Sequence, residues 1–169
     1  MRMKVIGRTL FGLIVCVVMG CSDATTPEPE KIVTPELDRK SEGVALSHNG
    51  GSCESDCRGF IQLLFDGTLR VDLIGEHPAQ LHIATVSEAE LTAIRTLTED
   101  PDLIAYLSGA EPDPDECVFF IPEAYSTILL REESQTLERD TWCSELAREL
   151  ASELEALEAK YIRGEQPAN

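Results

Sequence analysis

Phe60-Ile61-Gln62-Leu63-Leu64-Phe65-Asp66-Gly67-Thr68-Leu69-Arg70-Val71-Asp72-Leu73 is an alternating run of residues with a turn signal at its centre, and it sets the fold. Two segments rich in β-forming residues flank Asp66-Gly67, which is the pattern of a β-hairpin. A two-residue turn would place Ile61 opposite Asp72 and mix apolar and polar side chains on one face. A three-residue turn with Gly67 in the left-handed conformation separates the faces, so we predict that turn. Its register pairs Ile61 with Val71, Gln62 with Arg70 and Leu63 with Leu69.

The segments around the hairpin predict further strands and two short helices. Short β-type runs occur at 44–47, 81–86, 117–121 and 126–131, with a weaker one at 135–137. Ser87 and Glu90 form a Ser-x-x-Glu capping box, which predicts a helix over 88–98. Asp100-Pro101 is the start signal of a second helix, which Gly109 would end. The expected buried face of this second helix consists of Leu103, Ile104 and Leu107.

The strongest helical pattern lies near the end of the chain. Its apolar residues are spaced by three or four: Leu146, Leu150, Leu154, Leu157 and Tyr161. The predicted helix begins after a cap at Asp140 or Thr141 and is closed by Gly164. The expected fold class is therefore α+β, with an antiparallel sheet of about five strands covered by two or three helices and a long C-terminal amphipathic helix.

The first residues have the composition of an export signal. Arg2, Lys4 and Arg8 precede an apolar run at 10–19, which is too short to span a bilayer as a helix. Residues 22–43 are polar and contain several prolines, as in an extended linker. The predicted organisation is a signal peptide at 1–20, a flexible linker at 21–43, one domain at 44–164 and a tail at 165–169.

Val18-Met19-Gly20-Cys21, at the end of the signal, resembles the lipobox of bacterial lipoproteins. This resemblance implies that Cys21 is lipidated and becomes the first residue of the mature protein. An ordinary signal peptide cut nearby, with Cys21 as a spare thiol, is the alternative. Ser22 follows the cysteine in place of Asp, and the sorting rule of enteric bacteria then implies the outer membrane. The expected location is the cell envelope, with membrane attachment through the lipid alone.

The charge of the chain restricts its partners. The sequence contains 31 acidic and 14 basic side chains, for a net charge of −17. The signal segment contains three of the basic residues and none of the acidic ones, so its removal leaves −20. Contact with nucleic acid or anionic headgroups would cost electrostatic work. We therefore expect no nucleic-acid partner, and a protein partner that is cationic or neutral.

Four cysteines remain once Cys16 in the signal and Cys21 are set aside: Cys53, Cys57, Cys117 and Cys143. An even number in an exported chain favours disulfides. Cα atoms of bridged cysteines lie about 6 Å apart, whereas four extended residues span about 13 Å. The glycine-flanked segment between Cys53 and Cys57 can turn, which favours pairing of those two and of Cys117 with Cys143. The two pairings that join the first two cysteines separately to the last two stay open.

Other chemistry for these cysteines is less favoured. Glu54 and Asp56 would raise the pKa of the neighbouring thiols, which argues against a thiol-disulfide oxidoreductase at Cys53 and Cys57. A zinc site with His48 would have an unusual spacing in an oxidising compartment. The other histidines, His77 and His82, fit ordinary surface positions. We expect no metal, no cofactor and no catalytic residue.

Glu111-Pro112-Asp113-Pro114-Asp115-Glu116 gathers four carboxylates in six residues. Such a loop could bind calcium, although it lacks the residue order of an EF-hand, and a solvated loop is favoured. The chain also lacks a Gly-x-Ser-x-Gly elbow and a phosphate-binding loop.

The order of motifs resembles a family of small bacterial secreted and lipoprotein domains of unknown function. In that family Gly-Gly-Cys-x3-Cys precedes a strand and an Asp-Gly-Thr hairpin. The matching positions are Gly51, Cys53, Cys57, Asp66, Gly67 and Thr68; Ser52 and Arg58 depart from the pattern. The resemblance implies a fold and a compartment, without a known chemistry.

The sequence thus predicts a monomeric, lipid-anchored envelope protein that acts as a non-catalytic binding or structural module. The two alternatives are an oxidoreductase that uses Cys53 and Cys57, and a calcium-dependent interaction domain at residues 111–116.

Overall fold

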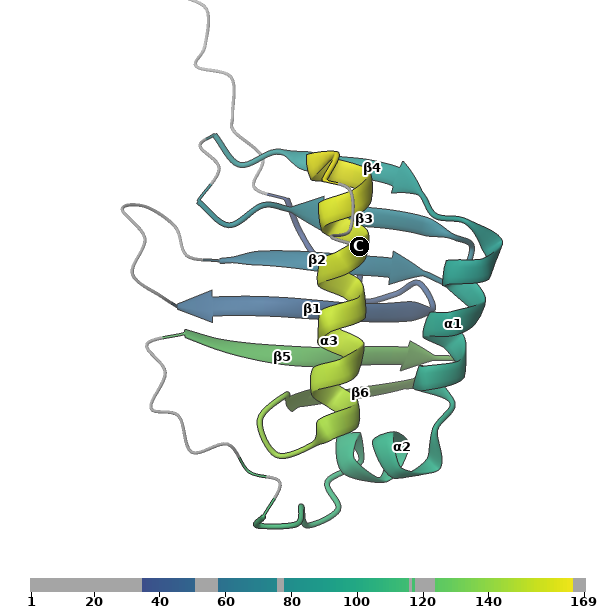
Figure 1. The fold of residues 1–169 in the computed structure, drawn as a ribbon, viewed down its shortest axis with the longest axis vertical. Helices are drawn as coiled ribbons and strands as arrows, with labels where there is room; N and C mark the ends of the chain where they lie inside the picture. Colours follow the sequence, from purple (N-terminus) through teal and green to yellow (C-terminus); the bar gives the residue numbers. More distant parts are fainter. Residues whose placement is uncertain (1–34, 51–57, 76–77, 116, 118–123, 166–169) are drawn as a thin grey trace, which may run out of the picture. The chain divides into compact units, whose positions relative to one another are not determined.

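The structure is a computed structural model that describes residues 35–50, 58–75, 78–115, 117 and 124–165 (Figure 1). The predictions for Cys21, Cys53, Cys57, His77 and most of the strand at 117–121 lie outside these residues.

Six strands form one antiparallel sheet in the order β4-β3-β2-β1-β5-β6 (Figure 1). Their bounds are Gly43–Gly50 (β1), Gly59–Leu64 (β2), Thr68–Asp72 (β3), Leu81–Thr85 (β4), Ala124–Glu132 (β5) and Gln135–Asp140 (β6). The antiparallel sheet is confirmed, but it has one strand more than the predicted number of about five. The weak signal at 135–137 is the start of the full strand β6, whose charged second half hides its β-pattern.

The hairpin has the predicted register. Ile61 lies opposite Val71, and Gln62 lies opposite Arg70. Gly67 has φ +89°, in the left-handed region that the three-residue turn requires. Ile61 and Leu63 of β2 therefore share one face of the sheet with Leu69 and Val71 of β3, and all four belong to the core.

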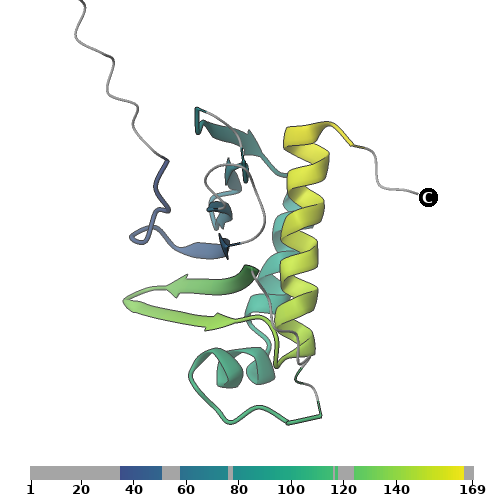
Figure 2. The same ribbon diagram turned by 90° about the vertical axis from the view of Figure 1, so that its left-hand side faces the viewer.

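The helices are α1 (Glu88–Thr98), α2 (Pro101–Leu107) and α3 (Glu145–Glu158), and α3 continues into a π-helical turn, η1 (Ala159–Arg163). The capping box of α1 is formed as predicted, and Asp100 caps α2. Gly164 ends the last helix with φ +70°. In Figures 1 and 2, α1 and α3 cover one face of the sheet, which we call the helix face.

The start of α3 differs from the prediction. Its cap is Ser144, whose Oγ accepts a hydrogen bond from the Ala147 N–H. Asp140 is the last residue of β6, and its carboxylate is already bonded to Tyr106 and Trp142. The predicted caps, Asp140 and Thr141, are therefore wrong, because the strand and its turn use these residues first.

The core lies between the helix face and the helices. Leu46, Ile61 and Leu63 from the sheet pack with Leu150 and Leu154 from α3, and all five are fully buried. The buried face of α2 differs slightly from the prediction, since Tyr106 is buried with Leu103 and Leu107 while Ile104 is half-buried.

Residues 35–42 lie against the other face of the sheet, and we call this segment the strap (Figure 2). The Gln62 side chain, 1 % exposed, accepts from the Asp38 N–H at 3.1 Å and donates to the Asp38 carbonyl at 2.6 Å. Arg39 forms an ion pair of 2.9 Å with Glu138 on β6. Residues 35–42 thus pack on the sheet, whereas the sequence places them in a flexible linker.

The strap has its own local structure. Asp38 accepts hydrogen bonds from the Ser41 hydroxyl and from the N–H groups of Lys40 and Ser41. These bonds lower the pKa of Asp38 to about 2. Within the described ranges, every helix is too short or too polar to cross a lipid bilayer.

Candidate functional site

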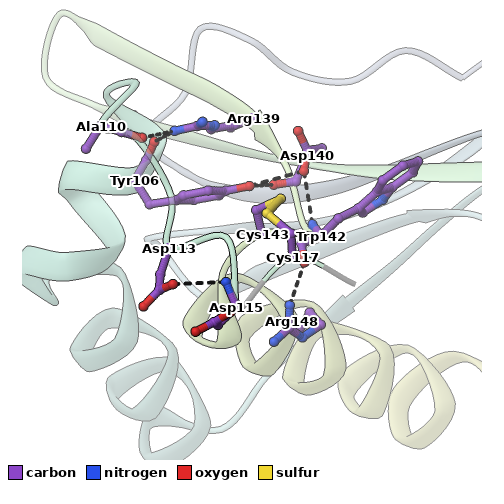
Figure 3. Close-up of a disulfide and its surroundings, with 10 residues drawn as sticks. All are labelled: Tyr106, Ala110, Asp113, Asp115, Cys117, Arg139, Asp140, Trp142, Cys143 and Arg148. Carbon is purple, nitrogen blue, oxygen red and sulfur yellow. Dashed lines mark hydrogen bonds between the residues drawn. A yellow bond between two sulfur atoms is a disulfide. The ribbon is translucent and has the colours of Figure 1, made fainter. Parts of the chain in front are cut away.

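Cys117 and Cys143 form a disulfide, which is the pairing that the sequence favours (Figure 3). The bond joins the end of the acidic loop to the connection between β6 and α3. The predicted bridge between Cys53 and Cys57, and the oxidoreductase hypothesis that depends on it, lie outside the described residues.

Tyr106 connects α2 to this disulfide region. Its hydroxyl lies 2.9 Å from the backbone oxygen of Asp140 and 3.1 Å from Oδ1 of the same residue (Figure 3). Burial, together with the charge and hydrogen bond of Asp140, raises the pKa of Tyr106 to about 12. Tyr106 therefore stays a neutral hydrogen-bond donor at physiological pH.

Arg139 lies over the ring of Tyr106, with its guanidinium carbon 4.2 Å from the ring centroid. Its Nη1 also donates to the carbonyls of Tyr106 and Ala110, at 2.6 Å each (Figure 3). One arginine of β6 thus fixes both the end of α2 and the start of the acidic loop. A lysine could not reproduce this arrangement, in which a planar guanidinium stacks on a ring and donates two hydrogen bonds.

The first turn of α3 is held to the same region. The Asp140 carboxylate accepts from the Trp142 N–H at 3.0 Å, and Arg148 on α3 donates to the Trp142 carbonyl at 2.7 Å. Ser144 follows the disulfide directly and caps the helix. Both ends of the connection between β6 and α3 are therefore fixed.

An acidic cleft of about 370 Å³ lies between α2, the acidic loop and the start of α3. Its charged lining residues are all carboxylates: Asp102, Glu111, Asp113, Glu145 and Glu149. Cys143, Tyr106 and Leu146 contribute to its wall. An uncompensated set of carboxylates attracts cationic groups and repels anionic ones.

A second acidic cleft, of about 380 Å³, lies between α1 and the turn joining β5 and β6. Glu42, Glu99, Glu132 and Glu133 line it, together with Arg95. Arg95 lies over the Phe65 ring, 5.1 Å from its centroid, and neutralises part of the local charge. The two clefts thus differ in whether a cation is built into the wall.

The calcium hypothesis concerns the loop that borders the first cleft. Asp113 accepts a hydrogen bond of 2.9 Å from the Asp115 N–H, which forms a local turn (Figure 3). Among the described residues, no three carboxylate, cysteine or histidine side chains lie in positions that could hold a metal ion together. Glu116 is outside the description.

His48, which the sequence weighs as a zinc ligand with Cys53 and Cys57, lies opposite Ser126 in the β1–β5 ladder. Its Nδ1 lies 3.0 Å from the Ser126 Oγ. Burial lowers the pKa of His48, and the charges of Glu155 and Glu158 on α3 partly offset this effect. The contact is a cross-strand polar pair at the edge of the core, while His82 is half-buried within β4.

Sequence reasoning missed the cleft and the Tyr106–Asp140–Arg139 network. These residues come from separate elements, and their spacing in the chain has no recurrent pattern. The signal that the sequence did offer was the carboxylate-rich loop at 111–116, of which Glu111 and Asp113 line the cleft.

Comparison with known proteins does not show which family the chain belongs to. The chain matches no protein-family model, and it has no significant match among curated proteins.

Proposed function

We propose that this chain is a lipid-anchored protein of the bacterial cell envelope that acts as a non-catalytic binding module. The observation that carries the proposal is the Cys117–Cys143 disulfide in a chain that begins with an export-type signal. Disulfides persist mainly in oxidising compartments outside the cytoplasm. The lipobox-like residues ending at Cys21 and the proline-containing segment after them supply the anchor and the tether.

Replacement of the anchoring cysteine tests the membrane attachment. In the Cys21→Ala variant we expect acylation to be lost and the protein to move from the membrane fraction to the soluble fraction. Fatty-acid labelling and fractionation measure both effects. Cys16→Ala is the matched control, because it removes a signal-peptide thiol and leaves the lipobox intact. An acylated, membrane-bound Cys21→Ala protein would exclude the proposed anchor.

The partner class follows from the charge. A mature chain with a strong negative charge attracts cationic segments, and added salt screens this attraction. We expect the protein to bind oligolysine and not oligoglutamate in low salt, with an affinity that falls as salt is added. Equal binding of both peptides, or of neither, would exclude a cationic partner.

Two triple variants with the same change in charge locate the interaction. Asp113→Asn/Glu145→Gln/Glu149→Gln alters the first acidic cleft, and Glu99→Gln/Glu132→Gln/Glu133→Gln alters the second. A larger loss of oligolysine affinity in the first variant assigns binding to the cleft without a built-in cation. Equal losses would mean that the overall charge alone attracts the peptide.

A further inference from the structure

The outer edge of β4 offers a site for strand addition. β4 is the first strand in the sheet order, and no described strand pairs with its outer side. The strand Leu81-His82-Ile83-Ala84-Thr85 contains no charged residue and no proline. Ile83 is 65 % exposed, the larger of the two values among exposed large hydrophobic residues of the described chain. Edge strands without such protective residues tend to pair with other strands.

The opposite edge, at β6, is protected in the usual ways. The Tyr106 hydroxyl donates to the backbone oxygen of Asp140, so α2 occupies part of that edge. β6 also carries Glu138, Arg139 and Asp140, of which Glu138 is paired with Arg39 of the strap. At the other edge, the Tyr161 hydroxyl on η1 accepts from the Ser87 N–H, but Ser87 lies two residues beyond the end of β4. Among the described residues, β4 thus differs from β6 in having no charged residue of its own.

The direction of the β4 backbone groups follows from the ladder. The Val86 N–H donates to the Gly67 carbonyl at 3.0 Å, on the β3 side. In an antiparallel pair, alternate residues bond to the same neighbour. His82 and Ala84 therefore bond towards β3, and the backbone groups of three residues point outward: Leu81, Ile83 and Thr85. On β6, the Thr141 N–H donates to the Ser126 carbonyl on the β5 side, so the backbone groups of the preceding residue, Asp140, point outward. This agrees with the hydrogen bond from the Tyr106 hydroxyl to the Asp140 carbonyl.

We propose that β4 pairs with β4 of a second copy of this chain, antiparallel and about a two-fold axis at Ile83. In this register Ile83 faces Ile83, and Leu81 faces Thr85. Every outward-pointing residue of one strand then meets an outward-pointing residue of the other, so the edge is self-complementary. The pairing joins two six-stranded sheets into one and covers the exposed Ile83 side chains.

The small area of the interface and the net negative charge of each copy both make this dimer weak in dilute solution. Two five-residue strands bury less than the roughly 800 Å² per partner of a standard interface. Each copy also carries a net charge of −17, and this repulsion weakens as salt shortens the screening length. If the chain is anchored as proposed above, residues 22–34 tether each domain to one membrane and raise the local concentration of copies.

Sedimentation of the full chain with Cys21→Ser tests the dimer without a lipid. We expect a monomer–dimer equilibrium that tightens with added salt. Ile83→Lys places like charges opposite each other and should weaken the dimer about tenfold or more. Ile74→Lys is the matched control, because Ile74 is 45 % exposed but lies outside β4, and its effect should stay within about twofold. A monomer at every concentration and salt, or equal effects of the two variants, would overturn the proposal.

The sedimentation result does not depend on whether Cys21 is lipidated in the native protein. Cysteine substitution tests the register of the proposed strand pairing. Residues directly opposite in an antiparallel pair lie within the Cα range of a disulfide. Ile83→Cys should therefore give an intermolecular crosslink under oxidation. Thr85→Cys should not, since its two copies would lie about 13 Å apart along the strands. Equal crosslinking of both variants, or of neither, would contradict this pairing.

Discussion

Gln62 is a buried polar side chain of the sheet, and His48 is a half-buried one. Gln62 lies on the strap face, where its Oε1 accepts from both the Asp38 N–H and the Arg70 guanidinium, at 3.1 and 2.6 Å. Its Nε2 donates to the Asp38 carbonyl. A buried amide with these partners stabilises the fold only while the partners stay in place, since an unmatched polar group is costly.

Replacement of Gln62 should release the strap. In Gln62→Ala we expect the free energy of unfolding to fall by about 1–3 kcal/mol, because the hydrogen bonds of the buried Gln62 amide to the half-buried Asp38 and Arg70 are lost. Amide exchange at Asp38 should become faster while exchange in β1 and β2 stays slow. Gln135→Ala, at an exposed position of β6, is the control. Unchanged exchange at Asp38 would show that Gln62 does not hold the strap.

His48 predicts a pH dependence of stability. Burial lowers its pKa in the folded state, so the unfolded chain binds the proton more readily. The contribution of His48 to the free energy of unfolding is therefore fully present above the ordinary histidine pKa of about 6.5. It is lost as pH falls below that value, and the loss levels off once pH is below the lowered pKa of the folded state.

The His48→Gln variant measures this contribution. Denaturant unfolding of wild type and variant should give stability curves that converge as pH falls from 8 to about 5.5. The difference at pH 8, where the imidazole is neutral in both states, reports packing and the contact with Ser126, and it serves as the internal control. Parallel curves over this range would contradict the assigned role of burial.

At the scale of elements, the disulfide is the main constraint on the corner formed by α2, the acidic loop and α3. It closes a loop with a sequence separation of 26. In the chain-entropy model, removal of such a loop constraint costs about 3–4 kcal/mol. This is a large share of the stability of a domain of this size.

The Cys117→Ser/Cys143→Ser double variant should unfold at lower denaturant concentration by about that amount. The loss should also appear as faster amide exchange in the first turn of α3, while the hairpin of β2 and β3 keeps its protection. Exchange that speeds up equally in all elements would show that the bond stabilises the whole domain and not this corner.

Local patterns in the sequence were sufficient to predict several elements. The hairpin register follows from the segregation of its two faces, and α1 follows from a complete capping box. In α1, burial alone would raise the pKa of Glu90, but hydrogen bonds from Lys160, Ser87 and Tyr161 lower it to about 2. The Glu90 carboxylate thus joins the start of α1 to η1, a tertiary contact that the capping pattern does not indicate.

Other elements depend on contacts between distant residues. Asp140 is a residue type that often caps helices, yet Tyr106 from α2 and the Trp142 N–H bind its carboxylate. The cap of α3 is Ser144, four residues later. The charged second half of β6 has no strand pattern in the sequence, and its Arg139 is held over the ring of Tyr106 from α2. The acidic cleft could not be predicted for the same reason.

At the scale of the whole molecule, the strap changes the boundary between tether and domain. Its residues have no apolar periodicity, so the sequence assigns them to the linker. Their position is explained by contacts with distant residues, namely the buried Gln62 and the ion pair between Arg39 and Glu138. If Cys21 is the anchor proposed above, the segment between Cys21 and the strap is shorter than the predicted linker of residues 21–43. A lipid anchor would hold the domain closer to the membrane than a free linker to residue 43 would allow.

Peptide mapping of the mature protein, with and without reduction, tests the central claim of a lipid-anchored, disulfide-closed module most directly. The account predicts an N-terminal peptide that begins at an acylated Cys21, and a Cys117–Cys143 peptide pair that separates only on reduction. An unmodified Cys21 peptide that continues from the preceding residues, or Cys117 linked to another cysteine, would contradict it.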